Sequence, residues 1–107
     1  VNVEEKKASE RLNSYEKTFF NMFSKYMSSF KNPDSVKIIN VWEIQGTKNY
    51  KVEVSATNSF GGTTSEYYWL DDDGISKYDK YDSLLFDSFA INIRCNCSLL
   101  TEALHEN

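Results

Sequence analysis

The side chains that could hold a metal or attack a substrate are few, and they lie near the C-terminal end. The 107-residue chain has two cysteines, Cys95 and Cys97, and one histidine, His105. A structural zinc site takes four ligands, and its cysteines usually form Cys-x-x-Cys pairs rather than Cys-x-Cys. Two ordinary thiols are therefore the better interpretation, and we expect neither a metal nor another cofactor. A lone histidine near a chain end, where chains usually fray, also argues against a Ser-His-Asp or Cys-His arrangement.

Acidic side chains offer a second possible chemistry. The run Asp71-Asp72-Asp73-Gly74 resembles part of a calcium loop. It lacks the alternating Asp-x-Asp-x-Asp-Gly spacing and the closing glutamate of such loops, so it predicts a turn. The spacing of the other carboxylates does not single out a general acid and base. We therefore expect no catalytic residues.

Length and composition place the chain among small folded domains. Residues 1–107 are enough for one domain, and hydrophobic residues make up 40% of it and aromatic residues 15%. A net charge of −4 argues against non-specific binding of nucleic acid, which needs a basic surface. No apolar run approaches the length of a membrane span. Because the sequence opens at Val1 rather than methionine, we expect an excised domain or a mature form whose upstream export signal has been removed.

A long amphipathic helix is expected over Glu4–Phe30, and Pro33 should end it. Its apolar positions recur at steps of three and four residues: Leu12, Tyr15, Phe19, Met22, Phe23, Tyr26 and Phe30. We interpret this stripe as the face that packs on a sheet; the alternative is a wall that lines a ligand site.

An antiparallel meander is expected to follow the helix. Ser35–Ile44 reads as the first strand, and two further strands flank Gly61-Gly62, taken as a two-residue hairpin turn. This turn predicts that Val54 faces Trp69. The preceding loop predicts that Trp42 faces Val52. A slip of one residue would exchange the two faces of a strand, so the register matters for every site assignment.

Two candidate sites follow from the predicted register. The face opposite the helix would carry a second apolar patch, which is either a partner surface or a surface covered by the C-terminal segment; its members are Ile39, Val41, Tyr68 and Leu70. The face toward the helix would carry the residues near the mouth of a possible helix–sheet pocket; these are Asn40, Trp42, Tyr67 and Trp69. Asn40 would then be a buried amide opposite Val54, and we expect it to be hydrogen-bonded.

The tail is harder to interpret. The segment from Ile75 to Asp82 is a loop or a short edge strand, and Ser83–Arg94 fits both a strand and a helix. Ser98–His105 predicts a short helix. The whole is an α+β chain with a long N-terminal helix packed on a curved antiparallel meander of three to four strands and a short C-terminal helix.

A partial family resemblance covers roughly residues 30–70. The run Asn32-Pro33-Asp34-Ser35-Val36-Lys37-Ile38, the run from Val52 to Gly62, and Tyr67-Tyr68 carry it. They resemble small uncharacterised helix-plus-sheet domains of exported and lipid-anchored proteins of Gram-positive bacteria. The resemblance implies an extracellular or envelope-anchored setting and supplies no catalytic residues.

The order of elements is also similar to that of cystatin-like folds. Cystatin inhibitors use a Gln-x-Val-x-Gly hairpin to block a cysteine protease, whereas the loop here reads Gln45-Gly-Thr-Lys-Asn49, so protease inhibition is not expected. The leading function hypothesis is a non-catalytic binding or accessory module of an exported bacterial protein. Its partner would be an unknown protein of the cell envelope, and the chain itself a monomer or weak dimer. The alternative is a small-ligand pocket, possibly enzymatic, between helix and sheet.

Overall fold

The computed structural model describes residues 7–44, 46–78, 90–92 and 96–106 of the chain. Its helical elements are α1 (Ala8–Arg11), α2 (Ser14–Phe23), the 3-10 helices η1 (Ser24–Ser29) and η2 (Pro33–Ser35), and α4 (Cys97–Leu104). Its strands are β1 (Lys37–Ile44), β2 (Tyr50–Thr57), β3 (Thr63–Asp71), β4 (Gly74–Lys77) and β5 (Ala90–Asn92).

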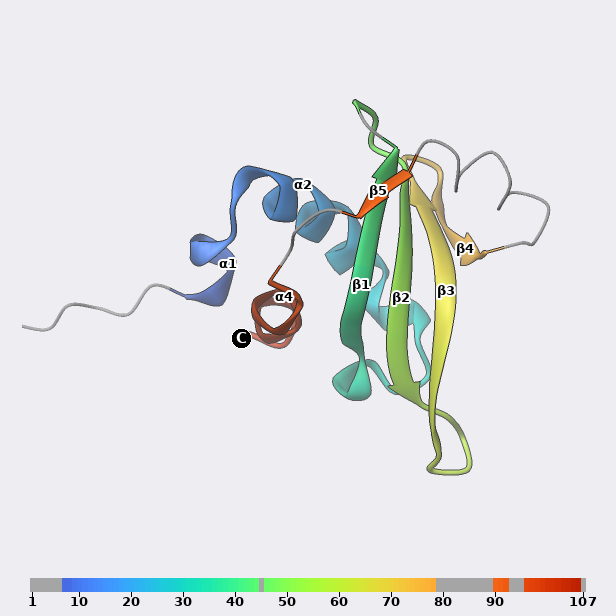
Figure 1. The fold of residues 1–107 in the computed structure, drawn as a ribbon. Helices are drawn as coiled ribbons and strands as arrows, with labels where there is room; N and C mark the ends of the chain where they lie inside the picture. The colour runs from blue at the N-terminus through green and yellow to red at the C-terminus, as the bar shows by residue number, and fades with distance from the viewer. Residues whose placement is uncertain (1–6, 45, 79–89, 93–95, 107) are drawn as a thin grey trace, which may run out of the picture.

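The strands form one antiparallel sheet in the order β4-β3-β2-β1-β5. Strands β1 to β4 are a consecutive meander, and β5 joins the outer side of β1. In Figure 1, α2 and η1 lie behind the sheet, and α4 lies beside β1. The predicted α+β class, with an N-terminal helix packed on an antiparallel meander and a short C-terminal helix, is confirmed. In the described part of the chain, no helix is long and apolar enough to cross a membrane.

The N-terminal helix is not the single helix that was predicted over Glu4–Phe30. Leu12 is extended, and the chain starts a new helix at Ser14, which continues through η1 to Ser29. The break is caused by a capping box, in which the Asn13 side chain accepts from the Glu16 N–H and the Glu16 side chain accepts from the Asn13 N–H, both at 2.8 Å. The helical period therefore located the helix but missed its internal start.

The apolar stripe of this helix packs on the sheet largely as predicted. Phe19 and Phe23 are fully buried and stack on each other, and Phe19 meets the ring of Tyr50 edge-on at 5.4 Å. Tyr15, in contrast, is 64% exposed. Tyr15, the second residue of α2, is therefore not part of the face that packs on the sheet.

The predicted register of the β2–β3 hairpin is wrong. Val54 pairs with Glu66, not with Trp69, because the loop spans Asn58–Gly62 rather than Gly61-Gly62 alone. The Asn58 side chain organises this loop by accepting hydrogen bonds from the N–H groups of Phe60 and Gly62 at 2.9 and 3.0 Å. Gly61 has a φ of +82°, a region that favours glycine. The shift of the pairing by three residues exchanges the two faces of β3.

The predicted pairing of β1 with β2 is also wrong, by one residue. Trp42 pairs with Lys51, and a bulge between Ile38 and Asn40 restores the inward position of Ile38. Val41 and Glu43 therefore face the core, whereas Asn40 and Trp42 face the opposite side. The core comprises Ala8, Leu12, Phe19, Phe23, Val36, Ile38, Val41, Tyr50, Val52, Val54, Leu70, Leu100 and Ala103.

The predicted C-terminal helix is present as α4, which covers part of the β1 edge. Thr101 Oγ1 accepts the Ile38 N–H at 2.9 Å. A His105 ring nitrogen lies 2.7 Å from the carbonyl oxygen of Val36, the residue before β1. His105 is therefore held in place, whereas the sequence predicted a frayed chain end. Within Ser83–Arg94, the segment whose pattern fits both a strand and a helix, Ala90–Asn92 is a strand; residues 79–89 and 93–95, and with them Cys95, lie outside the described part.

Candidate functional site

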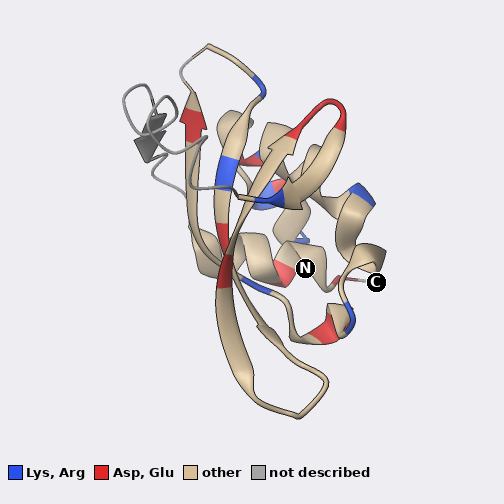
Figure 2. Cartoon of the chain, turned by 90° about the vertical axis from the view of Figure 1, so that its right-hand side faces the viewer, with Lys and Arg blue, Asp and Glu red and all other residues tan. Residues whose placement is uncertain are grey.

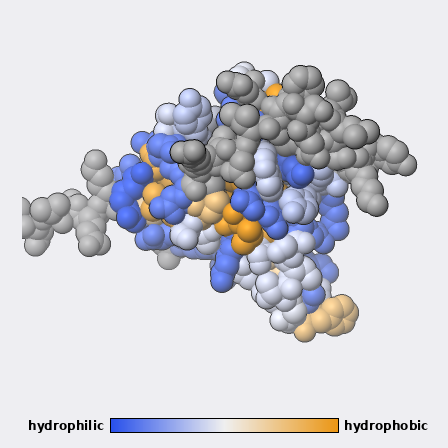
Figure 3. All heavy atoms as spheres, viewed as in Figure 1, coloured by the Kyte–Doolittle hydropathy of each residue, from blue (hydrophilic) through white to orange (hydrophobic). Residues whose placement is uncertain are grey.

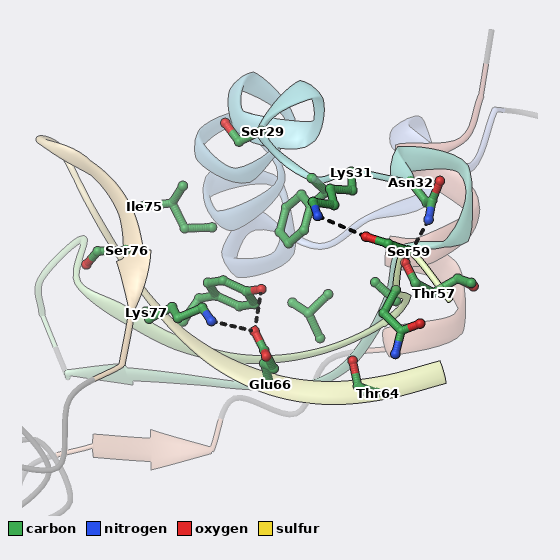
Figure 4. A pocket seen from close by; sticks show the side chains of 15 residues that line it. Ser29, Lys31, Asn32, Thr57, Ser59, Thr64, Glu66, Ile75, Ser76 and Lys77 are labelled. Carbon is green, nitrogen blue, oxygen red and sulfur yellow. Dashed lines mark hydrogen bonds and ion pairs between the residues drawn. The ribbon is translucent and has the colours of Figure 1, made fainter. Parts of the chain in front are cut away.

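A pocket of about 520 Å³ opens between the η1–η2 connection and the helix-facing side of β2, β3 and β4 (Figure 4). It lies where the helices stop covering the sheet, because Phe30 is extended and ends η1. The pocket is lined by Ser29, Phe30, Lys31, Asn32, Val54, Ala56, Thr57, Asn58, Ser59, Thr64, Glu66, Tyr68, Ile75, Ser76 and Lys77.

The floor of the pocket is apolar. Val54 and Ala56 come from β2, Ile75 from β4, and Phe30 from the end of η1. The ring of Tyr68 meets the ring of Phe30 edge-on, with centroids 5.3 Å apart. This contact fixes the tyrosine between the helix end and the sheet, so the floor is preformed.

One wall carries a chain of polar groups. The Tyr68 hydroxyl donates a hydrogen bond to Glu66 Oε2 at 3.0 Å, and Lys77 Nζ lies 3.6 Å from the same oxygen. Burial of the phenol raises the pKa of Tyr68 to about 12, and its hydrogen bond to Glu66 and the glutamate charge act in the same direction. Tyr68 is therefore a neutral hydroxyl at physiological pH and already uses its proton.

The other wall places a second lysine beside the hairpin loop. Lys31 Nζ donates to Ser59 Oγ at 2.9 Å, and Asn32 Nδ2 donates to the Thr57 carbonyl at 2.8 Å (Figure 4). These bonds join the residues before Pro33 to the end of β2. The pocket thus has an apolar floor and one lysine on each side, with Glu66 as the acid among its lining residues.

The predicted partner patch is not a surface. Val41 and Leu70 are each 0% exposed and belong to the core. Tyr68 lines the pocket, and Ile39, at the bulge, is 40% exposed. The two register errors account for this: they place Val41 and Leu70 on the side that faces the helix.

The four residues predicted for the pocket mouth lie together, but on the outer face of the sheet. Asn40 Nδ2 donates to Glu53 Oε1 at 2.8 Å, so its amide is hydrogen-bonded as expected, although outside the core. The rings of Trp42 and Tyr67 have centroids 6.0 Å apart, and Lys51 Nζ lies 5.1 and 5.0 Å from them. Trp69 Nε1 donates to Asp71 Oδ2 at 2.6 Å. None of these four lines the pocket.

Figure 3 looks onto this outer face. Where residues are described, it shows mostly hydrophilic or intermediate residues with small separate hydrophobic areas.

The acidic run Asp71–Asp73 forms the predicted turn between β3 and β4, red in Figure 2. Asp71 Oδ1 accepts the N–H groups of Asp73 and Gly74 at 2.8 and 3.2 Å, so this carboxylate closes the turn. Among the described residues, no three His, Cys, Asp or Glu side chains lie close enough together to hold a metal ion.

Sequence reasoning missed Lys31, Glu66 and Lys77. Asn58 was the available signal, because an asparagine three residues before a glycine pair can cap a wider loop than the two-residue turn. The wider loop would have placed Glu66 and Tyr68 on the face of β3 that lies toward the helix. Comparisons with protein-family models, with curated proteins and with solved structures found no match.

Proposed function

We propose that this chain is a non-catalytic binding or accessory module of an exported bacterial protein, and that the pocket beside Tyr68 is its binding site. The observation that carries the proposal is the apolar floor between Lys31 and Lys77. Apolar pockets with a few placed polar groups are the usual form of binding sites. The pocket suits a ligand group that has a negative charge next to an apolar part.

The state of Tyr68 supports binding rather than catalysis. A general base needs a pKa near the working pH, but the pKa of this phenol is raised to about 12. Its hydroxyl also donates to Glu66, and that glutamate is paired with Lys77. These groups can orient a bound anion, and they leave no poised acid–base pair on this wall.

The proposed setting is the cell envelope or the extracellular space, with an envelope protein as partner. It is supported by the sequence resemblance of residues 30–70, which includes the hairpin and the Pro33 segment that build the pocket. A small organic anion is the alternative ligand. The pocket volume of about 520 Å³ supports this alternative, because small-molecule sites commonly span about 300–1,000 Å³.

The proposal is tested by titrating the purified chain with short alkyl and aryl carboxylates and with the matching neutral amides. We expect carboxylates to bind more tightly than amides. Lys31→Ala and Lys77→Ala should each weaken carboxylate binding by about two- to fivefold, the usual worth of an exposed charge contact. Lys37→Ala is the control, because Lys37 is exposed and does not line the pocket. Equal binding of carboxylates and amides, or equal loss in the control, would overturn the proposal.

A further inference from the structure

We infer that the tip of the β2–β3 hairpin contacts a lipid bilayer, with the Phe60 ring entering the boundary between headgroups and acyl chains. This contact lies apart from the pocket ligand, so the inference goes beyond the proposed function. It rests on three properties of the loop: an exposed aromatic ring, backbone N–H groups that are already hydrogen-bonded, and a sequence without charged residues.

Among the described residues, Phe60 is the large hydrophobic side chain that the fold exposes most. It is 97% exposed, compared with 64% for Tyr15 and 43% for Tyr67. The loop that carries it projects past the helices at the lower end of the sheet in Figure 1. The ring is therefore already presented to any surface that approaches this end of the molecule.

The tip also lies away from the places where the chain enters and leaves the undescribed segment 79–89. The Tyr78 N–H donates to the Tyr67 carbonyl, in the middle of β3. Ala90 pairs with Ile44, at the end of β1 farthest from the hairpin loop. The described residues that flank this segment therefore do not lie at the tip.

The backbone of the loop is prepared for a less polar environment. Asn58 Oδ1 accepts the N–H groups of Phe60 and Gly62 at 2.9 and 3.0 Å, and the Asn58 carbonyl accepts the Gly61 N–H at 3.1 Å. The Asn58 N–H in turn donates to the Gly62 carbonyl at 2.8 Å. Backbone groups are costly to move out of water unless they keep a hydrogen-bond partner. Three consecutive N–H groups around the Phe60 ring keep theirs within the loop.

The charge distribution gives the hairpin end of the sheet to the bilayer. The run from Ser55 to Ser65 has no charged residue, whereas the acidic turn Asp71–Asp73 lies at the opposite end of the sheet (Figure 2). A charged side chain is costly to bring into the apolar layer of a bilayer. Lys31 Nζ, which donates to Ser59 Oγ at 2.9 Å, is on a long side chain that can keep its ammonium in the headgroup water. Because the net charge of −4 opposes a strongly anionic surface, the tip fits a zwitterionic one.

The small size of the tip favours a bilayer over a protein as its occupant. One aromatic side chain buries about 150–250 Å², whereas a specific protein interface buries about 800 Å² on each partner. The residues beside Phe60 in the loop are Ser59 and Gly61, which add little apolar area. A bilayer needs no matching surface, and its affinity for an inserted group scales with the apolar area that is buried. The contact is therefore weak and independent of salt.

The experiment is amide NMR of the isotopically labelled chain with phosphatidylcholine bicelles, with and without a lipid that carries a nitroxide spin label. The variants are Phe60→Ser, which removes the apolar ring, and Phe60→Leu, which keeps an apolar side chain. Tyr15→Ser is the matched control, because it removes an exposed aromatic ring from α2. Since both positions are exposed, the amide spectra should show that all three variants are folded.

We expect spin-label broadening at the amides of Phe60, Gly61 and Gly62, with none at Gly74 in the acidic turn. Phe60→Ser should lower the bound fraction roughly tenfold or more, the usual effect of losing one buried aromatic side chain. Phe60→Leu should lower it less than Phe60→Ser, and Tyr15→Ser and raised salt should leave it unchanged.

Broadening absent from the tip, or equally strong in Phe60→Ser, would overturn the inference. Broadening that disappears at raised salt would mean electrostatic adsorption, and a concentration-dependent shift of the Phe60 amide without lipid would assign the tip to a second copy; both also overturn it. Phe60 does not line the pocket, so Phe60→Ser should bind short carboxylates as the unaltered chain does. Failure of the membrane contact is thereby distinguished from failure of the proposed function.

Discussion

The Tyr68 hydroxyl donates to Glu66 Oε2 at 3.0 Å, across two positions of one strand. Both side chains therefore lie on the pocket side of β3, which faces the helix, whereas the predicted register placed Tyr68 on the face opposite the helix. The bond also sets the chemistry of the wall, because it keeps the phenol protonated and directs the glutamate away from the role of a free base. These contacts support the proposal that the pocket holds a ligand.

Alkaline pH should destabilise the fold through its buried tyrosines. Burial, with a contribution from the Glu43 charge, raises the pKa of Tyr50 from 10.0 to about 12. A raised pKa in the folded state gives stability that is complete below pH 10 and is lost as the pH rises through about 12. The loss for Tyr50 is roughly 2–3 kcal/mol. Urea unfolding at a series of pH values measures it.

Tyr50→Phe should reduce this alkaline loss, because it removes the hydroxyl and keeps the ring against Phe19. Tyr15→Phe is the control at an exposed position and should leave the loss unchanged. A Tyr50→Phe variant with the full alkaline loss would contradict the burial of this phenol.

The exchange of faces on β3 is tested by truncating two large side chains of this strand, Leu70 and Tyr67. Leu70 is 0% exposed, whereas Tyr67 is 43% exposed. Leu70→Ala should lower the free energy of unfolding by about 2–5 kcal/mol, through lost burial and the cavity left behind. Tyr67→Ala should cost about 1 kcal/mol or less. Chemical denaturation measures both, and the reverse order would restore the predicted register.

Glu16 should be among the most sensitive polar positions. Its side chain is buried and accepts the Asn13 N–H at 2.8 Å and the Asn96 N–H at 2.6 Å, so it joins the start of α2 to the start of α4. Glu16→Ala leaves two N–H groups without this acceptor and should cost about 2–4 kcal/mol. Glu10→Ala, at an exposed position of α1, should change stability by less than about 0.5 kcal/mol. A small effect at Glu16 would mean that the two helices are not joined there.

Moderate acid should loosen the contact between α1 and α4. Glu106 accepts hydrogen bonds from the Ser9 and Ala8 N–H groups, which lower the pKa of its carboxyl. A lowered pKa gives stability that is present above the ordinary carboxyl pKa and is lost as the pH falls through the folded value. Hydrogen exchange at the Ala8 and Ser9 amides should therefore quicken, relative to the intrinsic rate, as the pH falls below the ordinary carboxyl pKa and through the lowered pKa of Glu106.

Glu106→Gln is the matched variant, since it keeps the shape and removes the charge. It should remove the pH dependence and leave the two amides less protected at neutral pH. Protection of these amides that is unchanged between neutral and acid pH in the unaltered chain would contradict the role given to Glu106.

The sequence was sufficient to locate the first three strands and the helices that pack on them, and insufficient for the break within the N-terminal helix and for the register of the strands. Periodicity located the strands around Val54 and Trp69 and the helix around Phe19, because each has a strong apolar pattern. The faces depended on the loop at Asn58 and on the bulge near Ile39. Loop closure by a side chain and a single extra residue in a strand leave almost no trace in the hydrophobic pattern.

The candidate site depended on these same two features. Asn40, Trp42, Tyr67 and Trp69 were correctly grouped on one face, but that face is the outer one. The pocket residues come from the helix end, the hairpin and β4, so their proximity is set by how far η1 extends over the sheet. The hydrophobic pattern of the sequence does not show where η1 ends.

The most direct test of the central claim is amide NMR of the isotopically labelled chain during titration with short carboxylates. The account predicts shifts at the pocket residues Ala56, Ser59, Thr64 and Ser76, with none at Trp42 or Tyr67 on the outer face. Shifts concentrated on the outer face, or none at a concentration that saturates ordinary weak sites, would contradict the assignment of the pocket as the binding site.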